Sequence, residues 1–204
     1  MKKYEFEGKT KEEAIEKALT ELGVAEKNLI VNVLEEKNTL LKKNVKIEVI
    51  NYNDLVDYIK ENIIEITKKM GMTVNLEVRR RDDNITIKLF SDHNAVLIGR
   101  NGSTIEALQT IIRQMVHNEA KEFIGVILDV ENYKDKRIKN LEFLAKKVAK
   151  EVRETKVETK LDSMNSYERR IIHSILSDNK YVYTESVGEE PNRCVVVKPK
   201  ELEK

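Results

Sequence analysis

The stretch VLIGRNGSTIEALQTII, residues 96–112, decides how the fold is interpreted. Apolar residues recur at helical spacing on both sides of a central GRNG, which holds two of the chain's seven glycines, Gly99 and Gly102. Glycine lets a backbone turn sharply and lets another backbone come very close. We therefore predict a short helix that ends near Ile98, a tight GRNG loop, and a longer helix that begins at Ser103.

The predicted loop has the parts of a phosphate-binding site. Unpaired N–H groups and the positive end of the helix dipole point outward where the second helix begins, at Ser103 and Thr104. Arg100 adds a cation at the loop tip, and Asn101 adds polar donors. Apolar side chains beside the loop would form the floor of a groove for bases: Ile98, Ile105 and Leu108. The candidate nucleic-acid-binding residues of this segment are Ile98, Gly99, Arg100, Asn101, Gly102, Ser103, Thr104 and Ile105.

The surrounding pattern spans residues 52–130. A helical pattern is followed by two alternating strands joined across RRDDN, where Asp82 and Asp83 are interpreted as turn formers rather than acids. A buried-type strand, EFIGVILDV, closes the segment. This α-β-β-α-α-β order, with GRNG between the last two helices, resembles the KH domain in its type II topology. KH domains use a Gly-x-x-Gly loop to clamp four backbone nucleotides, so the resemblance implies a single-strand clamp.

Other glycine-rich sites fit this segment less well. A Rossmann or P-loop turn must follow a strand directly, whereas the apolar helical stretch DHNAVLI precedes this loop, and no Lys-Ser/Thr follows Gly102. Aromatic residues make up only 5% of the chain and none lies in the loop, so base stacking on aromatic rings is not the expected main mode. A helix–turn–helix with glycine caps and no ligand is the alternative that stays open.

The segment before the predicted KH domain, residues 1–51, has the pattern of a small β-α-β-β unit. Thr10 and Glu13 form a predicted capping box at the start of its helix, and Gly23 is expected to end that helix. The segment has balanced charge and shows no catalytic constellation.

The last segment, residues 131–204, is predicted to hold a long basic helix, a short strand, a second helix and two final strands across the turn GEEPNR. The second helix, with Asn165 and Glu168 as a candidate capping box, carries YERRIIHSIL. Arg169 and His173 are four residues apart and so share a helix face, with Arg170 beside them. Such a face can contact phosphates without acid–base chemistry, although this spacing alone is more often a solvated Arg and a half-buried His.

The last segment resembles the single-stranded nucleic-acid-binding domain named for an Arg and a His with three residues between them, here called the Arg-x-x-x-His domain. The three segments together resemble the Jag family, also called KhpB or EloR. The expected architecture is α+β, with an N-terminal domain at 1–51, a KH domain at 52–130 and an Arg-x-x-x-His domain at 131–204. The resemblance implies single-stranded RNA binding in post-transcriptional control of cell elongation, division or envelope synthesis. It also implies a small KH-only (KhpA-like) partner and leaves a homodimer open.

Composition limits the other classes of function. The 204 residues carry a net charge of +1, so nucleic acid would bind local patches rather than a generally basic surface. One cysteine, no signal-peptide pattern and no run of about 20 apolar residues predict a cytoplasmic protein. No cofactor, metal site or enzyme motif is expected, because the three histidines have no metal-ligand spacing to each other. A protein-interaction adaptor and a single-stranded DNA binder are the remaining alternatives.

Overall fold

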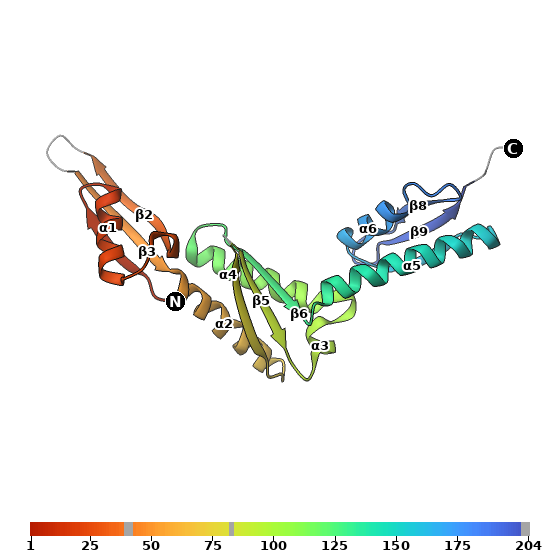
Figure 1. Ribbon diagram of the computed structural model, residues 1–204, viewed down its shortest axis with the longest axis horizontal. Coiled ribbons are helices and arrows are strands. Elements are labelled where there is room, and N and C mark those ends of the chain that lie inside the picture. Colours follow the sequence, from red (N-terminus) through yellow and green to blue (C-terminus); the bar gives the residue numbers. More distant parts are fainter. Residues whose placement is uncertain (39–42, 82–83, 201–204) are drawn as a thin grey trace. The chain divides into compact units, whose positions relative to one another are not determined.

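The computed structural model describes residues 1–38, 43–81 and 84–200 of the chain. The chain forms two compact units, Met1–Glu131 and Asn132–Lys204. Helices and strands are mixed along the chain, and the strands of the described residues form separate three-stranded sheets, two in the first unit and one in the second (Figure 1). The predicted α+β class with three domains is confirmed. The expected turn formers Asp82 and Asp83 lie outside the described residues.

The N-terminal part of the first unit is the predicted β-α-β-β arrangement. It consists of β1 (Tyr4–Gly8), α1 (Lys11–Leu22), the 3-10 turn η1 (Glu26–Asn28), β2 (Leu29–Asn38) and β3 (Lys43–Asn51). The sheet order is β1-β3-β2, with both pairs antiparallel, and α1 packs against β1 and β3. The Thr10 hydroxyl accepts from the Glu13 amide, as expected, and Gly23 ends the helix with a φ of 62°. The reciprocal bond differs from the prediction, because the Glu13 carboxylate accepts from the Lys9 amide.

The rest of the first unit has the predicted α-β-β-α-α-β order. It comprises α2 (Tyr52–Lys69), β4 (Asn75–Arg81), β5 (Asn84–Phe90), α3 (Asn94–Ile98), the 3-10 turn η2 (Arg100–Gly102), α4 (Ser103–Ala120) and β6 (Gly125–Val130). Strand β5 pairs with β4 antiparallel and with β6 parallel. Parallel strands need a long crossover. Here the crossover from β5 to β6 consists of α3, the GRNG loop and α4. The loop is therefore part of the connection that the parallel strand pair requires.

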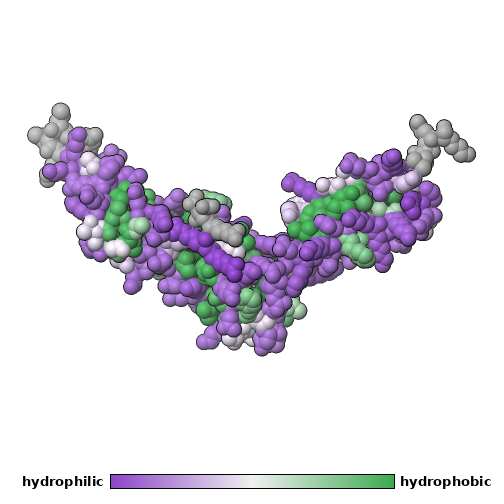
Figure 2. Space-filling view, viewed as in Figure 1, coloured by the Kyte–Doolittle hydropathy of each residue, from purple (hydrophilic) through white to green (hydrophobic). Residues whose placement is uncertain are grey.

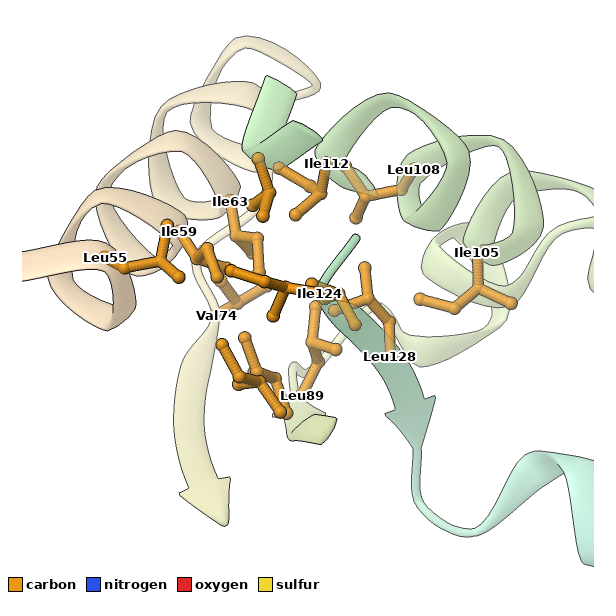
Figure 3. Packing of buried hydrophobic residues seen from close by; sticks show 14 of the residues in the cluster. Leu55, Ile59, Ile63, Val74, Leu89, Ile105, Leu108, Ile112, Ile124 and Leu128 are labelled. Atoms are coloured by element: carbon orange, nitrogen blue, oxygen red, sulfur yellow. The ribbon is translucent and has the colours of Figure 1, made fainter. Parts of the chain in front are cut away.

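A single apolar core holds this part together. Side chains from α2 and α4 meet those of the sheet, and Figure 3 shows them pointing toward one another. The labelled residues of that core are Leu55, Ile59, Ile63, Val74, Leu89, Ile105, Leu108, Ile112, Ile124 and Leu128. All ten are buried, with exposed fractions of 8% or less. The position of the loop therefore depends on the packing of α4, because the loop leads directly into the first residue of that helix.

The N-terminal sheet, β1 to β3, packs against the core formed by α2, α4 and the sheet β4-β5-β6. Strand β3 ends at Asn51 and α2 begins at Tyr52, without a linker. Ile30 and Ile50, from the sheet, belong to the same buried cluster as the residues of α2 and α4. The Asn32 side-chain amide also donates to the carbonyl oxygen of Ala120 at 2.8 Å. The two parts therefore form one compact unit, while the division at residue 51 stays a prediction.

The second unit contains α5 (Tyr133–Thr155), β7 (Thr159–Ser163), α6 (Ser166–Leu176), β8 (Val182–Val187) and β9 (Cys194–Pro199). The sheet order is β7-β9-β8, and both pairs are antiparallel. Helices α5 and α6 contact each other and the sheet (Figure 1). The apolar face of α5 supplies five buried residues to this core: Leu141, Ala145, Val148, Ala149 and Val152. Lysine, arginine and glutamate side chains make up much of the exposed surface of α5, together with Phe143, which is 70% exposed.

Candidate nucleic-acid interface

The GRNG loop has an unusual backbone. Gly99 has φ 74° and ψ −179°, and Gly102 has φ 83° and ψ 7°. Asn101 between them also has a positive φ, 53°. Positive φ is costly for most residues, and Gly and Asn adopt it most readily. The residue types of the loop therefore match its conformation.

Gly99 is needed for a second reason, which is close packing. A Cβ atom added at Gly99 would lie 2.8 Å from the backbone nitrogen of Thr104, closer than real Cβ atoms approach other atoms. The loop thus lies directly against the first turn of α4. The backbone amide of Gly99 donates to the Ala95 carbonyl oxygen at 3.0 Å. This hydrogen bond ends α3.

The outer side of the loop is open to solvent. Arg100 and Ser103 are exposed, Asn101 and Thr104 are half-buried, and Gly102 is buried. Gly102 is the N-cap residue of α4, and as a glycine it supplies no side-chain cap. A helix N-terminus without a side-chain cap, next to an exposed Arg, is an environment that suits an anion.

The apolar residues beside the loop differ in exposure. Ile105 and Leu108 are each 3% exposed and belong to the core, while Ile98 is half-buried and packs against that core. Val96, on α3, is 57% exposed and was not singled out from the sequence. In a five-residue helix the apolar spacing alone cannot tell which side chain faces outward. Whether these residues form the floor of a base-binding groove stays a prediction.

The second candidate site lies on α6 in the other unit. The predicted capping box is present, because Asn165 Oδ1 accepts from the Glu168 amide at 2.9 Å and Glu168 Oε2 accepts from the Asn165 amide at 3.3 Å. The buried Glu168 also accepts from Nε of Arg137, on α5, at 2.7 Å. Sequence reasoning missed Arg137, since its distance along the chain from Glu168 gives no signal of the contact.

Arg169 is a buried residue in this unit. Its exposed fraction is 7%, and its Nη1 donates to the Met164 carbonyl oxygen and to Glu190 Oε1, each at 2.8 Å. Glu190 belongs to the GEEPNR turn, so Arg169 links α6 to the loop before β9. The sequence pairs Arg169 with His173 correctly on one face of α6, but it does not reveal that the guanidinium packs inward.

His173 faces strand β8. Its Nδ1 lies 2.6 Å from Thr184 Oγ1, and its Nε2 lies 2.8 Å from Ser186 Oγ. Burial, and then the neighbouring charge of Arg169, lowers the pKa of His173 below its ordinary value. Both effects favour the neutral imidazole. Arg170 is the exposed residue of the three.

Family models match all three parts of the chain. The Jag N-terminus matches residues 6–50, the KH domain of KhpA/KhpB matches residues 53–127, and the Arg-x-x-x-His domain matches residues 139–199. The RNA-binding protein KhpB of Clostridium symbiosum is 36% identical over 195 residues, covering 93% of this chain and 88% of that protein. The chain belongs to the KhpB family.

Other KhpB family relatives differ in length. The RNA-binding protein KhpB of Bacillus subtilis is 30% identical over 200 residues, covering 95% of this chain and 96% of that protein. The match to the RNA-binding protein KhpB of Lactiplantibacillus plantarum is 35% identical, but it covers only 43% of that longer protein. The KH and Arg-x-x-x-His parts of this KhpB family member are nucleic-acid-binding modules.

Two other features, a membrane-spanning helix and a metal-binding cluster, are not found among the described residues. None of their helices is long and apolar enough to cross a membrane. Among residues 1–38, 43–81 and 84–200, there is also no group of three or more His, Cys, Asp or Glu side chains placed to hold a metal ion.

Proposed function

We propose that this KhpB family member binds single-stranded RNA, with the GRNG loop as the clamp on the backbone. The observation that carries the proposal is the backbone of Gly99 and Gly102. Their positive φ angles press the loop against the start of α4 and leave Arg100 exposed at a helix N-terminus without a side-chain cap. This arrangement offers a phosphate a cation and a positive helix end. Because a contact to the phosphate does not read the bases, the loop can bind single strands of many different sequences.

In the second unit, Arg170 is the cation of the α6 motif that solvent reaches. We propose that it contacts the same strand. Arg169 and His173 then act on the same face, through phosphate contacts of their own or by holding α6 against β8 and the GEEPNR turn. Binding through both units would raise affinity by effective concentration only if both faces can reach one strand.

The resemblance to the Jag family extends the proposal to biology. The protein would act in the cytoplasm as a binding protein rather than an enzyme, in post-transcriptional regulation of cell elongation, division or envelope synthesis. A small KH-only protein is the proposed partner. The curated relatives carry the name RNA-binding protein, which supports RNA as the ligand.

The loop is tested by Arg100→Asp/Asn101→Asp. Two carboxylates would face phosphate, so affinity for single-stranded RNA should fall at low salt while the circular dichroism spectrum stays unchanged. The matched control is Lys11→Asp/Asn53→Asp, which makes the same change of formal charge at exposed positions in the first turns of α1 and α2, where carboxylates are tolerated. Equal affinity of the loop variant and the control would remove the loop from the proposal.

The form of the nucleic acid is tested by competition at fixed salt. Single-stranded RNA should displace a labelled probe better than the same sequence annealed to its complement, because duplex RNA hides its bases in a deep, narrow groove. Better binding of the duplex would overturn the single-strand proposal. Equal binding of single-stranded DNA would keep the clamp and make RNA only one of its ligands.

A further inference from the structure

A row of cations lies on α5, outside the Arg-x-x-x-His motif. Lys146, Lys150 and Arg153 are spaced four and three residues apart, so they form one stripe along the helix. Lys146 and Lys150 have no ion-pair partner in the part of the chain that the structure describes, whereas the motif residue Arg169 is bound to Glu190. Positive charge available to a ligand therefore lies beside the motif and not only within it.

This stripe borders a groove where α5 meets the end of α6. The cavity has a volume of about 310 Å³, at the small end of the range of ligand sites. Ala149, Ile175 and Leu176 provide its apolar lining, and apolar surface over α6, bordered by hydrophilic side chains, is visible in Figure 2. The rest of the lining consists of the three cations, Asn179 and Tyr181. No carboxylate is among the lining residues.

One side of the groove is formed by the aromatic ring of Tyr181, which contacts Arg153. Tyr181 is 40% exposed, and the Arg153 guanidinium lies 5.5 Å from the centre of its ring. Arg153 has one acidic neighbour, Glu154, at 3.5 Å between Nη2 and Oε1. An exposed ring held in place beside cations is suited to a nucleobase, because every base has a face that can stack.

The turn that carries Tyr181 is also held in place. Asn179 Oδ1 accepts from the backbone amides of Tyr181 at 2.9 Å and Val182 at 3.2 Å. Nζ of Lys200 donates to the Asn179 carbonyl oxygen at 2.7 Å and brings another cation to this end of the groove. Because these two bonds use the side-chain oxygen of Asn179, its NH₂ group is the part of the side chain that can donate a hydrogen bond to a ligand. A preformed site binds more tightly because less conformational entropy is lost.

We propose that this α5–α6 groove holds one nucleotide of single-stranded RNA, with its phosphate at Lys146 and Lys150 and its base against Tyr181. The inference rests on the proposed function and adds a contact site that the Arg-x-x-x-His motif does not contain. Charge favours RNA over a protein segment, because an apolar peptide in this groove would desolvate two lysines that have no acidic partner among the described residues. The small volume fits one nucleotide rather than a longer segment.

The charge is tested with the full chain and a single-stranded RNA oligonucleotide. Lys146→Gln/Lys150→Gln should weaken binding evenly across sequences and make the log–log salt slope shallower by about 0.7, since the two lysines share one phosphate and each phosphate contact on a single strand contributes about 0.7. The control is Lys147→Gln/Lys160→Gln, which removes two exposed lysines of the same unit that do not line the groove. The control should keep the slope of the unsubstituted chain.

The aromatic contact is tested by Tyr181→Leu. Loss of stacking should lower affinity about five- to 150-fold with the salt slope unchanged. Tyr183→Leu is the control, because Tyr183 is 45% exposed on β8 but does not line the groove. Circular dichroism of all variants separates loss of binding from loss of fold, and Tyr181→Phe should keep the affinity if stacking is the interaction.

The outcomes are distinct. If the groove variants bind like their controls while Arg100→Asp/Asn101→Asp weakens binding, the groove proposal is wrong and the loop proposal stands. If the unsubstituted chain binds no single-stranded RNA, both fail. If the groove variants keep RNA affinity but lose a protein partner, the groove is a protein-docking site and the RNA assignment is overturned.

Discussion

Replacing Gly99 by alanine should destabilise the first unit more than a Gly→Ala change in an open turn. The combination of φ 74° and ψ −179° belongs to a region that only glycine adopts readily, and holding another residue there costs about 1–3 kcal/mol. The new Cβ would also lie 2.8 Å from the Thr104 backbone nitrogen, which cannot rotate away as a side chain could. We therefore expect a loss of about 3 kcal/mol, at the upper end of that range.

The assay is urea denaturation followed by circular dichroism, with a thermal melt alongside. For a unit of this size, about 3 kcal/mol corresponds to a fall of about 10 °C in the melting temperature. Gly23→Ala is the matched control, because Gly23 has φ 62° but nothing within 4 Å of an added Cβ. It should cost only about 1–2 kcal/mol, the strain of the left-handed conformation. A cost for Gly99→Ala no greater than that of Gly23→Ala would refute the close packing of the loop against α4.

Two further predictions concern α6. Arg169→Leu should destabilise the second unit by about 2–4 kcal/mol in urea denaturation, because it removes the buried hydrogen bond to the Met164 carbonyl and the partly buried ion pair with Glu190. The exposed Arg170→Leu should change stability by less than about 0.5 kcal/mol. Similar costs for the two would show that Arg169 has no structural role. Because the pKa of His173 is lowered in the fold, its contribution to stability is complete above its ordinary pKa of 6.5 and is lost as pH falls through the folded pKa. Melting temperature should then drop less between pH 7.5 and 5 in His173→Gln than in the unsubstituted chain, and an equal drop would contradict this reasoning.

Much of the fold can be predicted from local patterns. Strand alternation and helical spacing identified the elements of both units, and helix-terminal residues such as Asn165 with Glu168 and Gly23 marked where helices begin or end. These signals work because they act within a few residues of the chain, where side-chain spacing and backbone preference decide the structure. The Gly-x-x-Gly spacing belongs to the same class, since glycine is the residue that adopts the positive φ angles of this loop most readily.

The arrangement of the candidate sites depended on contacts between distant residues. Helical spacing placed Arg169 and His173 on one face, but only the packing of the GEEPNR turn and β8 against that face decided that Arg169 is buried and that the pKa of His173 is lowered. Likewise, no local pattern relates Lys150 to Tyr181, which lie on one groove because α5 packs against the end of α6. The sequence by itself determined the elements and their faces, because those follow from short-range geometry. Tertiary packing alone decided what covers each face, because burial and charge pairing are set by residues far apart in the chain.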